Sequence, residues 1–310
     1  MSTFPEFNEA NTGALTSVLD WLRWGASRFT EAGLFFGHGT ENAWDEAIFL
    51  LSSTIHQPWE LIDKIQQSAL TEVEQRAVHE IYRRRVEERM PAPYLTGVSW
   101  FSGYPYKVTQ DVLVPRSPIA ELILKDFDPW VSEAPRRILD MCTGSGCIGI
   151  ACAHQFPDAQ VTLTDISPEA LAVAEQNIQF HQLQGSVSAL LSDGFEALEG
   201  HTFDLIIANP PYVDAQDIAS MPAEFHAEPR LGLVSGDDGL DFTRVFLSQV
   251  NQYLNPNGVV IVEVGNSWVA LEDAYPAVSF VWPELESGGH GVFVLTKEQV
   301  EIISDGSSAH

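Results

Sequence analysis

The tetrapeptide Asn209-Pro210-Pro211-Tyr212 has the residue types needed to hold a flat, nitrogen-bearing group for reaction. A planar amide or amino nitrogen is a poor nucleophile, so it needs acceptors for its hydrogens and a platform that orients it. Asn209 could offer its side-chain oxygen, Pro210 its backbone carbonyl, and Tyr212 a ring that stacks on the flat group. The two prolines restrict the backbone, so these groups would be preorganised. The alternative is an ordinary Asn-Pro turn with a buried tyrosine.

A glycine-rich segment supplies a second candidate site upstream. Gly144, Gly146 and Gly149 match the spacing G-x-G-x-x-G between a predicted strand and a predicted helix. Glycines there let the backbone approach a ligand closely, although a purely structural turn remains open. Asp165 ends the next predicted strand and could accept both hydroxyls of a ribose. It could instead cap the helix that follows.

Asp140, just before the glycine turn, indicates which kind of nucleotide ligand the turn could bind. A carboxylate at this place would repel the pyrophosphate of a dinucleotide, which argues against a dehydrogenase. It could anchor the amino end of a nucleoside that bears an amino acid. S-adenosylmethionine is such a molecule, and it has no phosphate that requires a helix N-terminus.

These residues need a scaffold, and the pattern after residue 137 predicts one. Apolar and polar segments alternate as strands and helices, which indicates a mostly parallel sheet with helices on both faces. In such sheets ligands bind outside the carboxyl ends of the strands. We predict strands at 137–141, 160–164, 187–191, 203–207, 258–263, 277–282 and 292–296, and helices at 146–155, 168–182, 240–254 and 266–274.

The first ninety residues read as helical. A capping-box pattern at Thr71–Glu74 predicts a helix that Pro91 ends. This helix carries a basic cluster, which we interpret first as a solvated face. Its members are Arg83, Arg84, Arg85 and Arg89. Residues 97–114 are rich in aromatic and β-branched side chains, which predicts a hairpin or short strands that join two domains.

The composition excludes several function classes. The 310 residues include 43 acidic and 16 basic ones, a formal charge of −27, while 45% are hydrophobic, so the chain can bury a core. Residues 138–310 hold 24 acidic against 3 basic residues, a net charge of −21, and residues 1–137 hold the remaining −6. This excess disfavours DNA and anionic membranes, and suits either a basic partner or a solvated surface in a salty cytoplasm.

Cysteine usage and the N-terminal sequence point to the cytoplasm. Cys142, Cys147 and Cys152 have no C-x-x-C spacing, which argues against zinc or a disulfide framework and for reduced core thiols. We expect no metal site. No signal peptide precedes the first helix, and no apolar run is long enough for a membrane span.

The motifs at 140–146, 165 and 209–212 together resemble class I S-adenosylmethionine-dependent methyltransferases that act on planar nitrogens. Amino-methyltransferases of DNA adenine and RNA guanine share the Asn-Pro-Pro-Tyr form. Over about residues 12–300, further segments are similar to the protein-glutamine methyltransferases. These segments are Pro93-Tyr94-Leu95-Thr96-Gly97, Val112-Leu113-Val114-Pro115-Arg116, Glu228-Pro229, Gly236-Asp237-Asp238-Gly239-Leu240 and Glu263-Val264-Gly265.

One departure narrows the resemblance to a branch of this family. Release-factor enzymes usually continue Pro-Arg with Pro-Asp-Thr-Glu, whereas here Ser117-Pro118-Ile119-Ala120-Glu121 follows Arg116. Together with Tyr82–Arg85 and Gly37–Thr40, this looks like the branch that methylates large-subunit ribosomal protein three. The resemblance implies methyl transfer to the side-chain amide nitrogen of one glutamine in that basic protein, during ribosome assembly.

The resemblance also implies a domain plan and a set of site residues. Residues 1–92 would form a helical substrate-recognition domain, 93–118 a β-hairpin linker, and 119–310 the Rossmann-like methyltransferase domain with a seven-stranded sheet. The substrate glutamine would be held by Asn209, Pro210, Pro211 and Tyr212, of which Asn209, Pro210 and Tyr212 would be catalytic. The cofactor would be held by Asp140, Cys142, Thr143, Gly144, Ser145, Gly146, Asp165, Asp193, Gly194 and Asn209. Release-factor relatives often place Trp after the equivalent of Asp193, whereas this chain has glycine.

Three alternatives stay open beside this interpretation. The first is methylation of release factors, and the second is a nucleic-acid amino-methyltransferase, against which the acidity weighs. The third is a noncatalytic ribosome-assembly factor that retains the fold. His38 and His226 are candidate general bases, although a lone histidine is more often structural or exposed.

Overall fold

A computed structural model describes residues 7, 12–286 and 288–307 of the chain. It divides into two compact units. The first comprises Met1–Ser99 with Pro222–Ala227, and the second comprises Trp100–Met221 with Glu228–His310. The short segment at 222–227 therefore belongs to the helical unit, although it lies within the sequence of the larger one.

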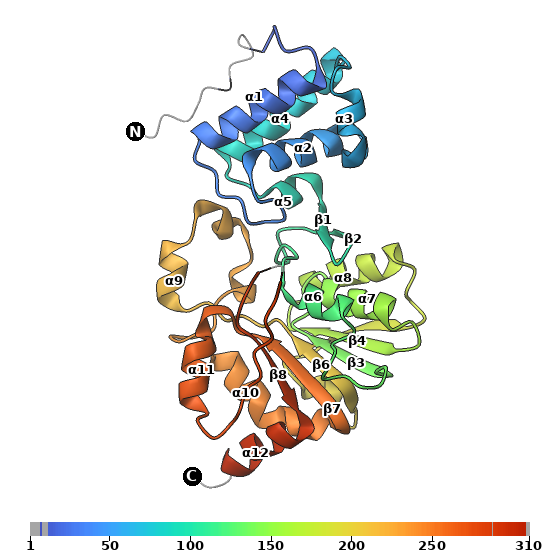
Figure 1. Ribbon diagram of the computed structural model, residues 1–310, viewed down its shortest axis with the longest axis vertical. Helices are drawn as coiled ribbons and strands as arrows, with labels where there is room; N and C mark the ends of the chain where they lie inside the picture. The colour runs from blue at the N-terminus through green and yellow to red at the C-terminus, as the bar shows by residue number, and fades with distance from the viewer. Residues whose placement is uncertain (1–6, 8–11, 287, 308–310) are drawn as a thin grey trace. The chain divides into compact units, whose positions relative to one another are not determined.

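The first unit is helical, as predicted (Figure 1). Its helices are α1 Val18–Glu31, α2 Ala43–Thr54, α3 Ile62–Ile65, α4 Glu72–Glu87 and α5 Ala92–Thr96, with 3₁₀ turns η2 Trp59–Leu61 and η4 Ala223–Ala227. The capping box at the start of α4 is confirmed, with Thr71 and Glu74 bonding each other's backbone. Helices α1 and α4 approach closely because Gly25 has no side chain. A Cβ there would lie 2.3 Å from the Tyr82 ring.

Arg83, Arg84 and Arg85 lie on α4, whereas Arg89 follows the end of that helix. The cluster is not simply a solvated face, and for Arg85 that prediction is wrong. The Arg85 side chain is only 1% exposed, and it donates to Glu46 at 2.6 Å and to Glu224 at 3.3 Å. Glu224 also accepts from Arg89 at 3.1 Å and from the Phe35 amide at 3.1 Å. A buried charge requires such partners. Glu224 lies 139 residues along the chain from Arg85, so the pattern of α4 alone could not reveal it.

The second unit is built on a mostly parallel sheet. Within the described residues this sheet has six strands in the order β5-β4-β3-β6-β7-β8, and β8 alone runs antiparallel to its neighbour. The strands are β3 Arg137–Met141, β4 Gln160–Asp165, β5 Val187–Leu191, β6 Phe203–Ala208, β7 Leu254–Glu263 and β8 Val292–Thr296. A separate two-stranded hairpin consists of β1 Val98–Phe101 and β2 Tyr104–Lys107.

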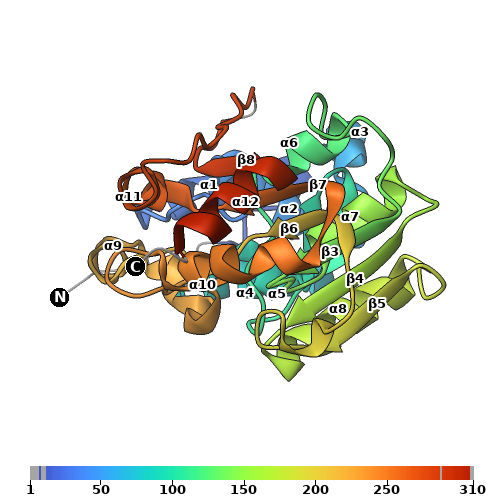
Figure 2. The ribbon, with the colours of Figure 1, turned by 90° about the horizontal axis from the view of Figure 1, so that it is seen from below.

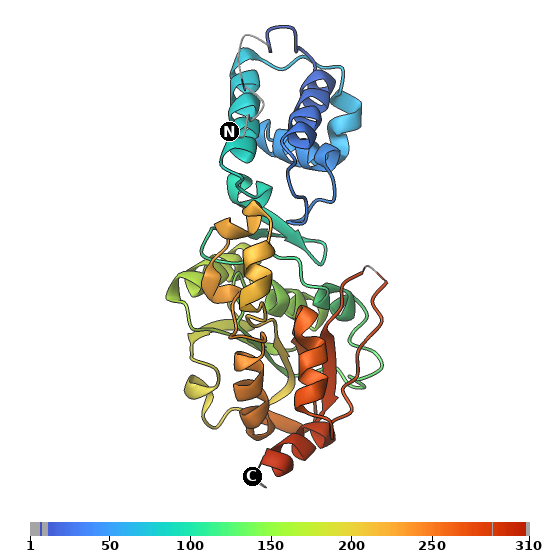
Figure 3. The same cartoon turned by 90° about the vertical axis from the view of Figure 1, so that its left-hand side faces the viewer.

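Helices cover both faces of the sheet because successive strand residues point to opposite sides. Ile138 packs in the layer with α7 and α8, whereas its neighbour Leu139 packs in the layer with α10 and α12 (Figure 2). Figure 3 looks onto the layer of α10, α11 and α12, coloured orange to red. The helices are α6 Ile119–Leu124, α7 Cys147–Gln155, α8 Pro168–Phe180, α9 Ala215–Ser220, α10 Asp241–Gln249, α11 Trp268–Ala274 and α12 Lys297–Ser307, with 3₁₀ turns η3 Glu196–Leu198, η5 Arg230–Gly232, η6 Val250–Tyr253 and η7 Gly265–Ser267.

The predicted strand at 277–282 is wrong, and with it the seven-stranded sheet. Across the described residues, this segment makes a single isolated bridge, between Val281 and Val294. Pro283 follows soon after and has no N–H with which to extend the ladder. On the other side of the bridge, the Ser279 carbonyl accepts from the Gln299 side chain at 2.6 Å. On one side of Val281 the backbone of Pro283 lacks an N–H, and on the other the Ser279 carbonyl is already bonded, so the strand ladder does not extend beyond the bridge.

The predicted hairpin is confirmed in part. Strands β1 and β2 end at Lys107, and the apolar residues Val108, Val112 and Val114 are buried in an irregular segment instead of a strand. Asn177 on α8 fixes the end of β2, because its side chain accepts from the Lys107 amide at 2.7 Å. Along the described part of the chain, no helix is long and apolar enough to cross a membrane.

Candidate active site

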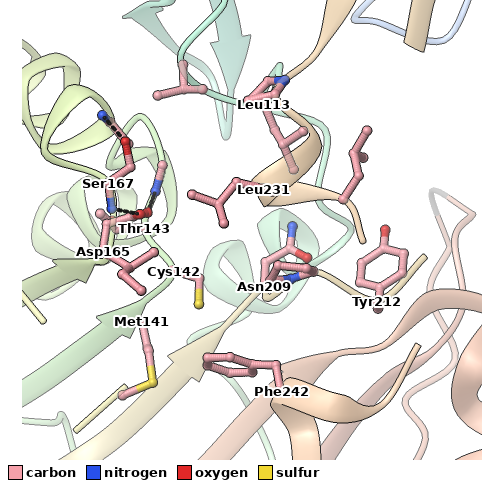
Figure 4. A pocket seen from close by; sticks show the side chains of 18 of the residues that line it. Leu113, Met141, Cys142, Thr143, Asp165, Ser167, Asn209, Tyr212, Leu231 and Phe242 are labelled. Atoms are coloured by element: carbon pink, nitrogen blue, oxygen red, sulfur yellow. Dashed lines mark hydrogen bonds between the residues drawn. The ribbon is translucent and has the colours of Figure 1, made fainter. Parts of the chain in front are cut away.

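A cavity of about 420 Å³ lies in the second unit, at the carboxyl ends of its parallel strands. Met141, Asp165 and Glu263 end the strands β3, β4 and β7, and Asn209 directly follows β6. All four line the cavity. Its volume falls within the usual range for small-molecule sites, about 300–1,000 Å³. Figure 4 shows Asp165 and Tyr212 on opposite sides, with Cys142, Asn209 and Leu231 between them.

The glycine turn between β3 and α7 brings backbone to the cavity wall. Cys142, Gly144 and Gly146 have φ values of 57°, 54° and 82°, in the left-handed region that favours glycine. Nothing lies within 4 Å of the position where Gly144 would carry a Cβ, so the turn presents bare backbone there. The turn is tied to β4, because the Thr143 amide donates to the Thr164 carbonyl at 3.0 Å.

Asp165 fixes the backbone at the end of the cavity formed by the glycine turn. Its Oδ2 accepts from the Gly144 amide and its Oδ1 from the Ser167 amide, both at 2.9 Å. Ser167, not Asp165, caps helix α8, because its side chain accepts from the Ala170 amide. A carboxylate has about four acceptor positions, so each Asp165 oxygen retains capacity for a ligand hydroxyl. Burial raises the pKa of Asp165, and the backbone donors oppose that rise.

Asp140 lies beneath the turn and does not line the cavity. Its Oδ2 accepts from the Thr143 hydroxyl at 2.6 Å and from the Gly149 amide at 2.9 Å. Its Oδ1 is buried and has no hydrogen-bond partner among the described residues. Burial raises the pKa of Asp140 to about 7. A buried acceptor without a donor is costly, which makes Oδ1 suited to a cationic ligand group.

The opposite end of the cavity is formed by the segment after β6. Asn209 is partly exposed and lines the cavity. Tyr212 is partly buried, and its hydroxyl donates to Glu263 Oε1 at 2.7 Å. The Tyr212 carbonyl accepts from the Ser267 hydroxyl at 3.0 Å. The segment is thus fixed around Tyr212, while the Asn209 amide is available to a substrate.

Hydrogen bonds also fix Arg116, Ser117 and Glu263, which line the same cavity. Ser117 donates to Glu263 Oε2 at 2.6 Å. Arg116 forms a two-pronged pair with Glu228, at 2.6 and 2.7 Å. Glu228 also accepts from the Val114 amide at 3.0 Å. Such bidentate pairs fix orientation as well as charge.

The cavity brings together most of the residues expected from the sequence. Those that line it are Cys142, Thr143, Gly144, Ser145, Asp165, Asp193, Gly194, Asn209, Pro211 and Tyr212. Asp140, Gly146 and Pro210 are not among its lining residues. His38 and His226 belong to the helical unit, and neither lines the cavity. His38 is buried, with its ring centroid 4.7 Å from that of Phe225, whereas His226 is exposed.

Several residues that line the cavity are not predicted as site residues from the sequence. Ile166 is 49% exposed and follows Asp165, where an apolar side chain could cover a flat base. Leu113, Leu231 and Phe242 also line the cavity, as Figure 4 shows. Glu263 offered a usable signal, because an acidic residue at the carboxyl end of a predicted strand lies at the ligand-binding edge. The leucines in irregular segments offered none.

Two of the three cysteines lie in the core, as the sequence predicts, whereas Cys142 is only partly buried. All three are free thiols in the described structure, and Cys147 and Cys152 are buried. Burial raises the pKa of Cys147 to about 12, so the thiol stays protonated. Cys142 lines the cavity, and burial raises its pKa too. The thiols are therefore suited to packing and not to nucleophilic attack.

Comparisons with known proteins show which proteins the chain is similar to. A family model described as the methyltransferase small domain matches residues 119–236. The ribosomal protein uL3 glutamine methyltransferase of Francisella tularensis subsp. tularensis is 44% identical over 288 residues, which cover 92% of each chain. The ribosomal protein uL3 glutamine methyltransferase of Neisseria gonorrhoeae is 45% identical over 296 residues, which cover 95% of this chain and 98% of the relative.

Solved structures show the same fold at low sequence identity. The hMettl16 catalytic domain in complex with MAT2A 3'UTR hairpin 1 matches with a TM-score of 0.50 and 15% identity, over 74% of this chain and 82% of that one. That likeness shows the methyltransferase fold alone. The two relatives described above are similar over nearly their whole length. The chain therefore belongs to the ribosomal protein uL3 glutamine methyltransferase family.

Proposed function

We propose that this chain transfers a methyl group from S-adenosylmethionine to the side-chain amide nitrogen of one glutamine in ribosomal protein uL3, during ribosome assembly in the cytoplasm. The observation that carries the proposal is the full-length similarity to two uL3 glutamine methyltransferases, at 44% and 45% identity. The cavity supports it, because its opposite sides hold acceptors for a nucleoside and groups for a planar amide.

The residues at the glycine turn fit S-adenosylmethionine. Asp165 has acceptor capacity for two ribose hydroxyls, and the turn at Gly144 presents unobstructed backbone to the methionine part. The buried Oδ1 of Asp140, which has no partner among the described residues, is the acceptor that we assign to the ammonium group, although Asp140 does not itself line the cavity. Ile166, with Asp193 and Gly194, would cover the adenine. When bound, the cofactor supplies an activated methyl group on a sulfonium.

The residues after β6 would position the acceptor nitrogen. Asn209 Oδ1 and the Pro210 carbonyl would each accept one hydrogen of the glutamine amide, which directs the nitrogen lone pair toward the methyl group. The Tyr212 ring would hold the amide plane by stacking. As charge develops on the nitrogen, the two acceptors would relieve it, and the proton would leave afterwards to water. No histidine is required as a base.

The acidic surface supports a basic protein as substrate. The net charge of −21 on residues 138–310 would repel a nucleic acid and attract a basic ribosomal protein. This charge argues against the alternative of a nucleic-acid amino-methyltransferase. We call the side of the cavity at the glycine turn and Asp165 the cofactor end, and the side at Asn209 and Tyr212 the acceptor end. The residues expected at both ends are present, which argues against a noncatalytic assembly factor. Methylation of release factors remains the nearest alternative, since it uses the same chemistry.

A methyl-transfer assay with labelled cofactor tests the proposal. The purified full chain is incubated separately with uL3, with a peptide chain release factor and with ribosomal RNA. We expect label in uL3 and, after digestion, on a single glutamine. Label in the release factor alone would reject uL3 as the substrate, and absence of label from all three would support the assembly-factor alternative.

A further inference from the structure

We propose that Glu263 is a positioning residue for methyl transfer, which holds the Tyr212 ring in its working orientation through the phenolic hydroxyl, with Ser117 orienting the Glu263 carboxylate. This inference rests on the proposed function, because it gives a role in methyl transfer to a cavity-lining residue whose two carboxylate oxygens both accept from protein hydroxyls. It concerns the end of the cavity where the glutamine amide would lie.

The hydroxyl of Tyr212 has one well-defined acceptor. It donates to Glu263 Oε1 at 2.7 Å, and Glu263 is only 5% exposed. Hydrogen bonds to a charged acceptor are roughly twice as strong as neutral ones. The link therefore restricts rotation of the ring about its Cα–Cβ bond.

The remainder of Tyr212 is fixed at two other points. Its ring packs directly on the backbone of Gly265, where a Cβ would lie 2.5 Å from Cε2. Its carbonyl accepts from the Ser267 hydroxyl and lies against Gly239, whose Cβ would come within 2.1 Å of that oxygen. Ring face, carbonyl and hydroxyl are each held by a different group. The Glu263 link is the contact that fixes the far end of the ring.

Ser117 gives the Glu263 carboxylate a fixed orientation. The Ser117 hydroxyl accepts from the Ile119 amide at 3.2 Å, which leaves its own hydrogen to donate to Glu263 Oε2 at 2.6 Å. Glu263 is also the last residue of β7, where it pairs with Val292 of β8. The carboxylate is therefore held by the sheet through its backbone and by two hydroxyls through its oxygens.

Both oxygens of Glu263 are engaged, which argues for positioning and against proton transfer. Oε1 accepts from Tyr212 and Oε2 from Ser117. Burial raises the pKa of Glu263, whereas these two hydrogen bonds and the nearby charge of Arg116 oppose that rise. The negative charge of Glu263 in turn raises the pKa of Tyr212, after burial itself. The tyrosine thus stays a neutral donor.

Kinetics of full-length variants test the proposal with uL3 as acceptor. In Glu263→Ala the ring loses its far anchor, so we expect kcat to fall at least ~10-fold, since small displacements of a positioning group are costly. The dissociation constant for S-adenosylmethionine should stay within about twofold. Glu263→Gln keeps an acceptor oxygen for Tyr212, so it should keep kcat within about threefold. Thr243→Val, which alters another buried hydroxyl that does not line the cavity, is the matched control.

A double-mutant cycle shows whether Glu263 acts through the hydroxyl. Tyr212→Phe removes the hydroxyl and keeps the ring. If the link carries the effect, adding Glu263→Ala to Tyr212→Phe should cost little more than Tyr212→Phe alone. Fully multiplicative losses, or wild-type kcat in Glu263→Ala, would overturn the proposal. So would a Glu263→Gln variant as inactive as Glu263→Ala that has also lost the acidic limb of the pH–rate profile, because that result marks a proton-transfer group.

A spectroscopic experiment tests the contact between Tyr212 and Glu263 without substrate. The chain has seven tyrosines, so the Tyr212 signal in a spectrum of Cζ-labelled tyrosine is identified by its loss in Tyr212→Phe. In Glu263→Ala that signal should shift and titrate at lower pH, because the neighbouring negative charge is gone. An unmoved signal would reject the link. If the wild-type chain does not methylate uL3, the proposed function fails while this arm still tests the contact between Glu263 and Tyr212.

Discussion

The two ends of the cavity are assembled in different ways. At the cofactor end, Asp140 bonds Thr143 three residues away and Gly149 nine residues away, and Asp165 bonds Gly144 across 21 residues. At the acceptor end, the partners are far apart in the chain. Tyr212 and Glu263 are separated by 51 residues, and Ser117 and Glu263 by 146. The first end is the product of one local βαβ unit, whereas the second exists only once the whole sheet has formed.

This difference predicts that substitutions at the two ends affect different quantities, which variants can test. Changes at the cofactor end should act on the dissociation constant for S-adenosylmethionine. Changes at the acceptor end should act on kcat, with cofactor binding preserved. A variant that altered both quantities equally would show that the two ends are mechanically coupled instead.

The largest effect is expected at the acceptor end, from Asn209→Ala. Loss of the side-chain oxygen removes one acceptor for the substrate amide, so methyl transfer should fall at least ~100-fold, as for other preorganised polar groups. Cofactor binding, measured by calorimetry, should persist. Asn266→Ala is the control, because Asn266 is exposed and does not line the cavity. Near-normal turnover in Asn209→Ala would remove Asn209 from its role.

The next effect is expected at the cofactor end, from Asp165→Ala. The dissociation constant for S-adenosylmethionine should rise about 30-fold, because hydrogen bonds to a charged group contribute about 1.5–3 kcal/mol. At saturating cofactor, kcat should stay within about threefold. Asp158→Ala, which removes an exposed carboxylate, should change neither value. If kcat at saturation fell as much as binding, the proposed division between the two ends would be refuted.

The same contrast explains what the sequence could predict. The glycine turn, Asp165 and the order of strand, turn and helix lie within one short stretch, and the structure forms those elements as predicted. The tetrapeptide at 209–212 was recognisable because its residue types are unusual together. The residues that hold this tetrapeptide in place could not be recognised from the sequence, since nothing in the local pattern indicates that Ser117 would contact Glu263. Their contact depends on how the sheet orders its strands.

Two errors have the same origin. The basic run on α4 has the pattern of a solvated face, yet Arg85 is buried against Glu46 and Glu224. The segment at 277–282 has the composition of a strand, yet its neighbours Pro283 and Gln299 prevent a ladder. Partners distant in sequence, Glu224 for Arg85 and Gln299 for Ser279, overrode a local preference, and the adjoining Pro283 also limited the ladder at 277–282. Local patterns predicted element types well and tertiary pairing poorly.

The pH dependence of cofactor binding shows whether Asp140 holds the cofactor ammonium, and so whether residues of the local segment alone form the cofactor end. Burial raises its pKa to about 7 in the free protein. If Oδ1 receives the cofactor ammonium, the bound form requires the carboxylate, so binding below pH 7 must release a proton. The dissociation constant should then rise about 10-fold between pH 8 and pH 6, since each pKa unit corresponds to a factor of ten. Calorimetry in two buffers of different ionisation enthalpy would detect the released proton.

Asp140→Asn provides the control for that experiment. The variant cannot ionise at this position, so its dissociation constant should be flat over the same pH range and no proton should be released. If the wild-type chain is equally flat, Asp140 supports only Thr143 and Gly149. The ammonium must then be held by another group, and the cofactor end would include a contact that the local segment does not supply.

The smallest effect concerns how uL3 reaches the acceptor end. The net charge of −21 on residues 138–310 would steer a basic protein, and added salt screens that attraction. From about 0.1 M to about 1 M salt, the screening length falls from about 10 Å to about 3 Å, so kcat/KM for uL3 should fall about threefold. The value of kcat should be unchanged, because steering acts on encounter and not on the bound complex. Cofactor affinity, measured in the same salt series, serves as the internal comparison for the other end of the cavity. If kcat/KM is flat or rises with salt, the acidic excess has no role in substrate capture, and adaptation to saline surroundings is the remaining explanation.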